Sequence, residues 1–222
     1  MLTGLDLIAM SLLLVIMYKH HLSHLIKITK QNNILYAHFI ASITLFLISL
    51  TQAYSYQPQR GDLLFQDLNC GALCNAITKV TYGYNNTQIS HVAMIISTGK
   101  HAKVIEAIGT SVHLTPLSVF LLRSTDQNGN PRVIVGRLKA PYRYLIPEAI
   151  KIALKWQGLP YNATFKSDNQ FKTFYCSELI YDAFMLANNN KPIFKLNTMT
   201  FKQNGKFLPE WISYFKQQKA NI

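Results

Sequence analysis

Two long apolar runs dominate the first 50 residues of the chain. Leu2–Tyr18 contains three polar side chains, and Ile34–Leu50 contains one histidine and a few hydroxyl groups. Each run is about the minimum length that crosses a bilayer as a helix. Lys19, Lys27 and Lys30 lie between the runs. Because positive charge stays on the cytoplasmic side, we expect this basic loop inside and everything after the second run outside the cytoplasm.

The second run also has the features of a signal peptide. Two lysines precede it, and Thr51-Gln52-Ala53 after it resembles a small-residue cleavage site. Both interpretations predict export through one or two N-terminal membrane or signal helices, but they differ on whether the protein stays tethered. A third interpretation is two buried helices of a soluble fold, although the runs lack the polar face that a surface helix needs. We divide the chain into N-terminal hydrophobic segments, residues 1–53, and a folded domain, residues 54–222.

Short strand and helix patterns follow one another in the folded domain. Apolar segments bounded by turn residues predict strands that pair as hairpins. Longer segments with helical spacing predict helices. The expected strands are Gly61–Gln66, Ser90–Ser97, Ala102–Ile108, Val112–Leu114 and Arg132–Leu138, and the expected helices lie within Asn69–Thr81, Pro116–Leu122, Pro147–Gln157 and the residues after Phe174. We expect the aromatic tail beyond Pro192 to pack over this body. The predicted fold class is α+β.

The helix after Phe174 carries a cysteine in its first turn. Thr173 is the expected N-cap, and Asn188–Pro192 is a stop signal. Its apolar face has helical spacing and consists of Leu179, Ile180, Ala183, Phe184 and Ala187. Free backbone N–H groups and the positive end of the helix dipole stabilise a thiolate at Cys176, and the thiolate is the reactive form of cysteine. The alternative is a buried cysteine of the core.

His91 and Glu106 are predicted to share one face of a hairpin. His91 begins the strand Ser90–Ser97, and Glu106 lies near the end of the returning strand. A two-residue loop would set the two residues directly opposite each other, whereas a four-residue loop at Thr98–His101 would set Glu106 opposite Ala93. In both registers they face the same side of the sheet. A carboxylate beside an imidazole can take the orienting role of a catalytic triad, and a structural His–Glu pair is the alternative.

The other two cysteines, Cys70 and Cys74, are one helical turn apart. They would form a disulfide in an oxidising compartment. Residues at this spacing on a regular helix are poorly oriented for that bond, so packed thiols are the alternative. In both cases we expect a structural role.

Charge and motifs limit the classes of partner. The formal net charge is +12, from 22 Lys and Arg against 10 Asp and Glu, and the positive residues are dispersed. Such a charge suits an anionic surface, such as cell wall or lipid headgroups, or only solubility. No nucleic-acid motif, His-Glu-x-x-His zinc pattern, phosphate-binding loop or dinucleotide fingerprint occurs, so we expect no nucleic-acid partner, metal or cofactor. His101 and His113 are expected to be surface residues.

Four blocks of the sequence resemble a known enzyme family when they are taken in order. The blocks are Gly61-Asp62-Leu63-Leu64-Phe65, Ser90-His91-Val92-Ala93-Met94-Ile95, Val104-Ile105-Glu106-Ala107 and Tyr175-Cys176-Ser177-Glu178-Leu179-Ile180. The set resembles the permuted papain-like cysteine hydrolases, and more narrowly the YiiX/YebB-like branch of the NlpC superfamily. Gly158-Leu159-Pro160-Tyr161 also looks like a family position before the cysteine. Asn162 departs from the pattern, because an acidic residue is expected there, and this difference affects substrate contacts.

The resemblance implies a fold and a set of roles. The fold is a helix bearing the cysteine, packed on an antiparallel sheet that carries the histidine. Cys176 would be the nucleophile, His91 the base and Glu106 the third member of the triad. The reaction would be acyl transfer, with the backbone N–H of Cys176 in the oxyanion hole.

Three functions from different classes remain open on the sequence. The first is a cell-envelope cysteine amidase or peptidase, for which export points to peptidoglycan stem peptides. The second is a lipid ester hydrolase or acyltransferase that uses the same triad. The third is a non-catalytic envelope-binding module, for which Cys176 would be dispensable. The expected partners are a peptide, peptidoglycan or lipid substrate, and a membrane through the N-terminal helices.

Overall fold

The structure is a computed structural model, and it describes residues 19, 56–81, 83–166, 170–196 and 200–218. The chain divides into two compact units, Met1–Tyr56 and Gln57–Ile222. The two apolar runs expected near the N-terminus, the cleavage-like site and the boundary after residue 53 lie outside the described residues. Among the residues that are described, no helix is both long and apolar enough to cross a membrane.

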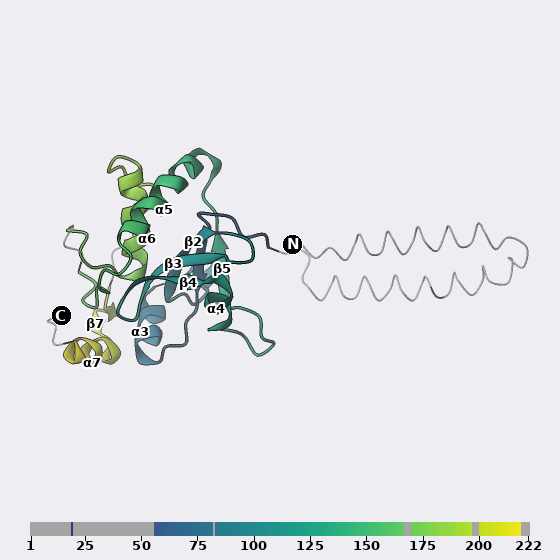
Figure 1. The fold of residues 1–222 in the computed structure, drawn as a ribbon. Helices are drawn as coiled ribbons and strands as arrows, with labels where there is room; N and C mark the ends of the chain where they lie inside the picture. The colour runs from purple at the N-terminus through teal and green to yellow at the C-terminus, as the bar shows by residue number, and fades with distance from the viewer. Residues whose placement is uncertain (1–18, 20–55, 82, 167–169, 197–199, 219–222) are drawn as a thin grey trace, which may run out of the picture. The chain divides into compact units, whose positions relative to one another are not determined.

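A five-stranded antiparallel sheet forms the centre of the second unit (Figure 1). The strands follow the order β4-β3-β2-β1-β5 across the sheet. Their bounds are β1 Leu63–Gln66, β2 His91–Ser97, β3 Lys103–Ile108, β4 Ser111–Pro116 and β5 Val133–Gly136. Each lies within, or within two residues of, a segment with a strand pattern, so the α+β prediction is confirmed.

The hairpin of β2 and β3 has the register expected for the four-residue loop at Thr98–His101. Met94 pairs with Ile105 and Ile95 with Val104, and an irregularity shifts the pairing at Ser97. Continued to the strand ends, this register sets Glu106 opposite Ala93 and makes it a diagonal neighbour of His91. The two predicted site residues therefore share a face, as both registers require.

Helices cover both faces of the sheet, which explains why β2 is apolar at nearly every position. On one face, α5 (Ile146–Lys155) and α6 (Cys176–Ala187) lie side by side (Figure 1). On the other face, α4 (Leu117–Leu122) covers the sheet with Leu117 and Phe120. The core between the sheet and the pair α5 and α6 includes Val92, Met94 and Ile105 of the sheet and Leu179, Ala183 and Phe184 of α6. The core between the sheet and α4 includes Leu64, Ala93, Ile95 and Val104 of the sheet.

A separate aromatic cluster joins the C-terminal tail to the body, as predicted. The helix α7 (Pro209–Gln217) packs against α3 (Ala72–Val80) and buries Trp211 and Phe215 on Phe165. The sequence patterns do not predict α7 itself or the short hairpin before it. The remaining elements of the described chain are η1 Tyr84–Asn86, η2 Ala140–Leu145, β6 Lys202–Gln203 and β7 Lys206–Phe207.

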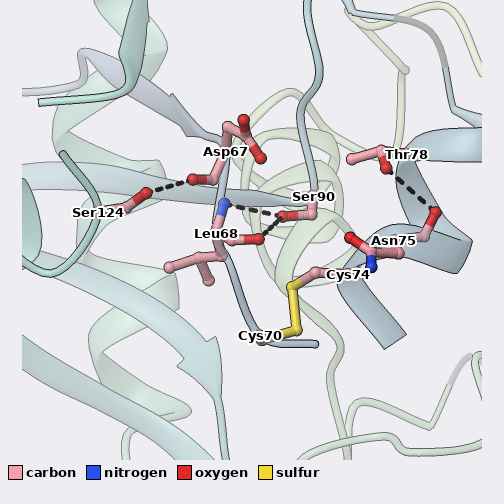
Figure 2. The surroundings of a disulfide bond; sticks show 8 residues. All are labelled: Asp67, Leu68, Cys70, Cys74, Asn75, Thr78, Ser90 and Ser124. Carbon is pink, nitrogen blue, oxygen red and sulfur yellow. Dashed lines mark hydrogen bonds between the residues drawn. A yellow bond between two sulfur atoms is a disulfide. The ribbon is translucent and has the colours of Figure 1, made fainter. Parts of the chain in front are cut away.

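Cys70 and Cys74 form a disulfide bond (Figure 2). The bond is possible because α3 begins at Ala72, so Cys70 precedes the helix and the two cysteines are not both on it. The segment before the disulfide is tied to the start of β2, where the backbone N–H of Leu68 donates to the hydroxyl of Ser90 at 3.0 Å. The disulfide thus lies directly after this contact, at the start of α3.

Candidate active site

Glu106 is a buried carboxylate with a full set of donors. Its side chain has no exposed surface. His91 Nε2 lies 2.6 Å from Oε2, Thr115 donates its hydroxyl to Oε1 at 2.5 Å, and both terminal nitrogens of Arg123 donate at 3.0 and 2.5 Å. Burial alone would raise the pKa of Glu106, but the hydrogen bonds from His91, Arg123 and Thr115 lower it to about 2. Glu106 is therefore ionised at neutral pH.

Arg123 is itself held in place from two sides. Its Nε donates to Gln66 Oε1 at 2.9 Å, and the Gln66 amide donates to the carbonyl of Phe120 at 2.7 Å. The guanidinium also lies 4.5 Å above the centre of the Phe120 ring. These contacts fix the guanidinium in the geometry that binds a carboxylate with two parallel hydrogen bonds.

Sequence reasoning identified neither Arg123 nor Thr115 nor Gln66. Thr115 could have been found by the face rule that joined His91 to Glu106, because β4 pairs with β3 in a register that puts Thr115 diagonal to Glu106. Arg123 follows α4, and its position depends on how that helix docks on the sheet. No local pattern carries that information.

His91 lies between Glu106 and the cysteine. It is the first residue of β2, pairs with Gln66 of β1, and is only 5% exposed. Burial alone lowers the pKa of His91, but its hydrogen bonds to Cys176 and Glu106 and their negative charges raise the pKa above the ordinary value. Because Nε2 faces Glu106, the nitrogen that remains for Cys176 is Nδ1.

Cys176 is the first residue of α6, which confirms its predicted place in the first turn. The N-cap is Tyr175, however, and the prediction of Thr173 was wrong. The helix begins later because the carboxylate of Glu178 accepts a hydrogen bond from the backbone N–H of Tyr175 at 3.2 Å. This bond provides an acceptor for a backbone donor at the N-terminus of the helix. The other two cysteines are bonded to each other, so Cys176 is the free thiol of the chain.

The surroundings of Cys176 favour its thiolate. Burial would raise the pKa of the thiol, but the hydrogen bond and the positive charge of His91 outweigh burial. The backbone N–H groups of Val92 and Ser177 add hydrogen bonds, and the pKa of Cys176 lies below its ordinary value. The structure thus brings all three predicted residues into one connected chain of contacts, in the order Glu106, His91, Cys176.

The loop before α6 adds two further residues to the surroundings of the thiol. Burial first, and then the nearby Cys176, raise the pKa of Tyr161, so this hydroxyl stays protonated next to the cysteine. Asn162 is buried and donates to Glu178 Oε2 at 3.2 Å and to the carbonyl of Lys166. The residue that departs from the family pattern therefore holds Glu178.

A cavity of about 630 Å³ opens beside the cysteine. Its walls include both chain neighbours of Cys176, Tyr175 and Ser177. The apolar part of the lining is Leu63, Phe65, Val92, Ile180, Met185, Phe194 and Leu196, and the remaining side chains are Glu178, Tyr181, Asp182 and Lys195. Cys176 itself is not part of the lining, so a group bound there lies beside the segment that carries the thiol.

The remaining histidines of the folded domain take no part in the hydrogen bonds of Glu106 described above. His101 is exposed in a turn, and His113 is half-buried opposite Glu106 in β4. Within the described ranges, no group of three or more His, Cys, Asp or Glu side chains is arranged to hold a metal ion.

Comparison with known proteins identifies relatives of the chain. The family model for permuted papain-like amidase enzymes, YaeF/YiiX, C92 family, matches residues 57–218. The uncharacterized protein YiiX of Escherichia coli (strain K12) is 27% identical over 145 residues, which are 65% of this chain and 66% of that protein. A crystal structure described as metalloprotein yiiX from Escherichia coli O157:H7 has 27% sequence identity and a TM-score of 0.46, over 60% of this chain and 68% of that one.

The family match spans most of the chain and includes all four sequence blocks and the site. It confirms the resemblance that the blocks predict. The chain spans just under two thirds of the YiiX protein from strain K12. The chain belongs to the YaeF/YiiX, C92 family of permuted papain-like amidases.

Proposed function

We propose that the chain hydrolyses an amide bond of a cell-envelope substrate through an acyl-enzyme on Cys176. His91 is the acid and base of this reaction, and Glu106 orients His91. The observation that carries the proposal is the chain of hydrogen bonds from the Arg123-bound carboxylate through the imidazole to the thiol. A nucleophile, a base and an orienting carboxylate in contact are the parts that acyl transfer by a cysteine needs.

The reaction follows from the protonation states of the three groups. The Cys176 thiolate attacks the carbonyl carbon, and the imidazolium of His91 gives its Nδ1 proton to the leaving amine. The thioester that remains is attacked by a water molecule, whose proton returns to His91, and the acid leaves as the thiolate re-forms. The ionised Glu106 stabilises the imidazolium at each stage.

The start of α6 supplies donors for the oxyanion. The first N–H groups of a helix have no partner within the helix and point towards its N-terminus. The backbone N–H of Cys176 is one of these groups, because Cys176 is the first residue of α6. It is the donor we assign to the negative charge that develops on the carbonyl oxygen.

The apolar cavity supports a second candidate, a lipid ester as the substrate. Seven apolar side chains line the cavity beside Cys176, and such a lining suits an acyl chain. The same thiolate would attack an ester carbonyl, and the leaving alcohol would take the proton from His91. Activity on short amides and esters, each compared with Cys176→Ala, distinguishes the two candidates.

Two observations support a location outside the cytoplasm. The basic loop and the apolar runs at the N-terminus are the features of an exported chain. The Cys70–Cys74 disulfide is of the kind that persists in oxidising compartments. Peptidoglycan stem peptides are the amide substrates that such a location offers, and a folded domain with its net positive charge suits an anionic wall.

The rate of alkylation of Cys176 against pH tests the proposal. With the disulfide intact, iodoacetamide reports on this thiol alone. We expect an apparent pKa well below the free value of about 8.5, and we expect His91→Gln to restore that value and to slow the reaction at pH 6 about tenfold or more. The matched control is His101→Gln, in an exposed turn. An ordinary thiol pKa in the unmodified protein would contradict the mechanism and favour the non-catalytic binding module.

A further inference from the structure

Asp182 differs from the other buried acidic residues of the described chain. Asp62 is bound by Arg137, Glu106 by Arg123, and Glu178 by Asn162. Asp182 is 6% exposed, and no donor among the described residues lies within hydrogen-bonding distance of it. Asp182 also lines the cavity beside Cys176.

An unpaired buried carboxyl group is costly to the fold. Removing a carboxylate from water without a compensating partner is unfavourable, and native proteins rarely keep such groups. Burial first, and then the negative charge of Glu178, raise the pKa of Asp182 to about 7. A cation that enters the cavity and pairs with the carboxylate offsets part of this cost.

The position of Asp182 relates it to the reacting group. It follows Cys176 by six residues on the same helix, which corresponds to a rise of about 9 Å. Glu178 lies one turn before it on the same cavity wall. A ligand paired with Asp182 has to span about this axial rise to bring its reacting group to the level of the thiol.

We propose that this cavity binds a primary ammonium group carried on an apolar chain, with Asp182 as its counter-ion. The inference rests on the proposed function in that the ligand is part of the substrate whose carbonyl group meets Cys176. The apolar walls contact the chain, and Asp182 and Glu178, one turn apart on α6, supply carboxylate oxygens for the N–H donors. Lys195 also lines the cavity, but it is exposed and forms no ion pair with Asp182 in the described chain.

A matched pair of probes tests this assignment. We would measure the binding of n-hexylamine and 1-hexanol to the full chain in a zwitterionic detergent, by calorimetry at pH 8. We expect the amine to bind about tenfold more tightly, since a hydrogen bond to a charged group contributes about that factor. Asp182→Asn should remove the preference, and the control Glu148→Gln, an exposed acid of α5, should keep it. Equal binding of the two probes, or an unchanged preference in Asp182→Asn, would overturn the inference.

The pH dependence supplies a readout that a structural role would not change. Below pH 7 the carboxyl group of Asp182 becomes protonated, so the preference for the amine should fall between pH 8 and pH 5.5. The other ionisable groups of the cavity are Tyr175, the N-cap of α6, Glu178 and Tyr181 on α6, and Lys195 on the following segment. If one of them caused the change, the same dependence would persist in Asp182→Asn, and the assignment would be wrong.

Binding is measured without turnover, so the inference and the proposed function can fail separately. The Cys176→Ala variant should keep the amine preference although it cannot form an acyl-enzyme. A preference without activity on any amide would contradict the proposed function alone, and activity without a preference would contradict the ammonium site alone. Thermal unfolding of each variant shows whether it is folded. If Asp182→Asn does not fold, Asp182→Ser is used in its place.

Discussion

Replacing Arg123 by Met should destabilise the fold by an amount that depends on pH. The lowering of the Glu106 pKa from 4.5 to about 2 corresponds to about 3 kcal/mol in favour of the ionised form. Arg123 donates two of the four hydrogen bonds that the described residues make with this carboxylate. Methionine keeps the apolar stem above Phe120 but removes both donors. We expect a loss of about 2 kcal/mol at pH 7, which urea denaturation measures.

The sign of the pH dependence follows from the direction of the shift. Because the folded-state pKa of Glu106 lies below its unfolded value, the stabilisation is complete above pH 4.5 and is lost as the pH falls towards 2. In Arg123→Met the folded-state pKa is higher, so Glu106 takes up its proton sooner and the missing donors matter less. The difference in unfolding free energy between the two proteins should therefore shrink by about 1 kcal/mol from pH 7 to pH 3.

Arg143→Met is the matched control for this experiment. Arg143 donates its Nε to the carbonyl of Leu138 at 2.9 Å, and it pairs with no carboxylate in the described chain. Its replacement should cost stability equally at both pH values. If Arg123→Met behaves in the same way, or costs nothing at pH 7, the guanidinium does not hold Glu106 in its ionised form.

Three further changes test other parts of the fold. Asn162→Asp replaces the amide that donates to Glu178 at 3.2 Å by a carboxylate, and the two negative charges repel each other. Urea denaturation should therefore show a loss of stability of about 1–2 kcal/mol at pH 7 that diminishes at pH 4. A loss that does not depend on pH would contradict this repulsion. Gly61→Ala adds a Cβ 2.6 Å from Ile146 at φ +83°, and should lower stability by about 1 kcal/mol more than Gly158→Ala, where φ is +88° and no atom is near; equal losses would exclude the steric part. Reduction of the disulfide should cost about 2 kcal/mol in thermal unfolding, and a double Ser variant should not respond to the reductant.

Much of the fold could be predicted because both strand and helix periods are visible in the sequence. The apolar segments around His91 and Glu106 predicted the hairpin, and both possible loop lengths predicted that the two residues share a face. The structure adopts one of the two registers and has an irregularity in the pairing at Ser97. No residue pattern predicts this irregularity. The helical spacing after Phe174 likewise gave the position of Cys176, whereas the helix start depends on the contact between Glu178 and the Tyr175 backbone.

The groups that sequence reasoning missed act through tertiary contacts. Arg123 reaches Glu106 only because α4 folds over the sheet, and Asp182 is notable only because no donor approaches it. A strand pattern shows which face a residue occupies, but it does not show what covers that face. The membrane or signal role of the N-terminal runs stays a prediction, since those runs lie outside the described residues.

The assembly of the site itself shows why its parts are separated in the sequence. By strand alternation, His91 and Glu106 belong to the sheet face covered by α4, whereas Cys176 packs with the cluster under α5 and α6 on the opposite face. The two faces meet where β2 begins, because a side chain on the first residue of a strand can reach past the sheet end. The backbone N–H of Val92, the next residue of β2, also faces the thiol there. Cys176 and His91, the proposed nucleophile and base, thus come from separate packing layers. Each is held by its own core, and the two meet at the start of β2.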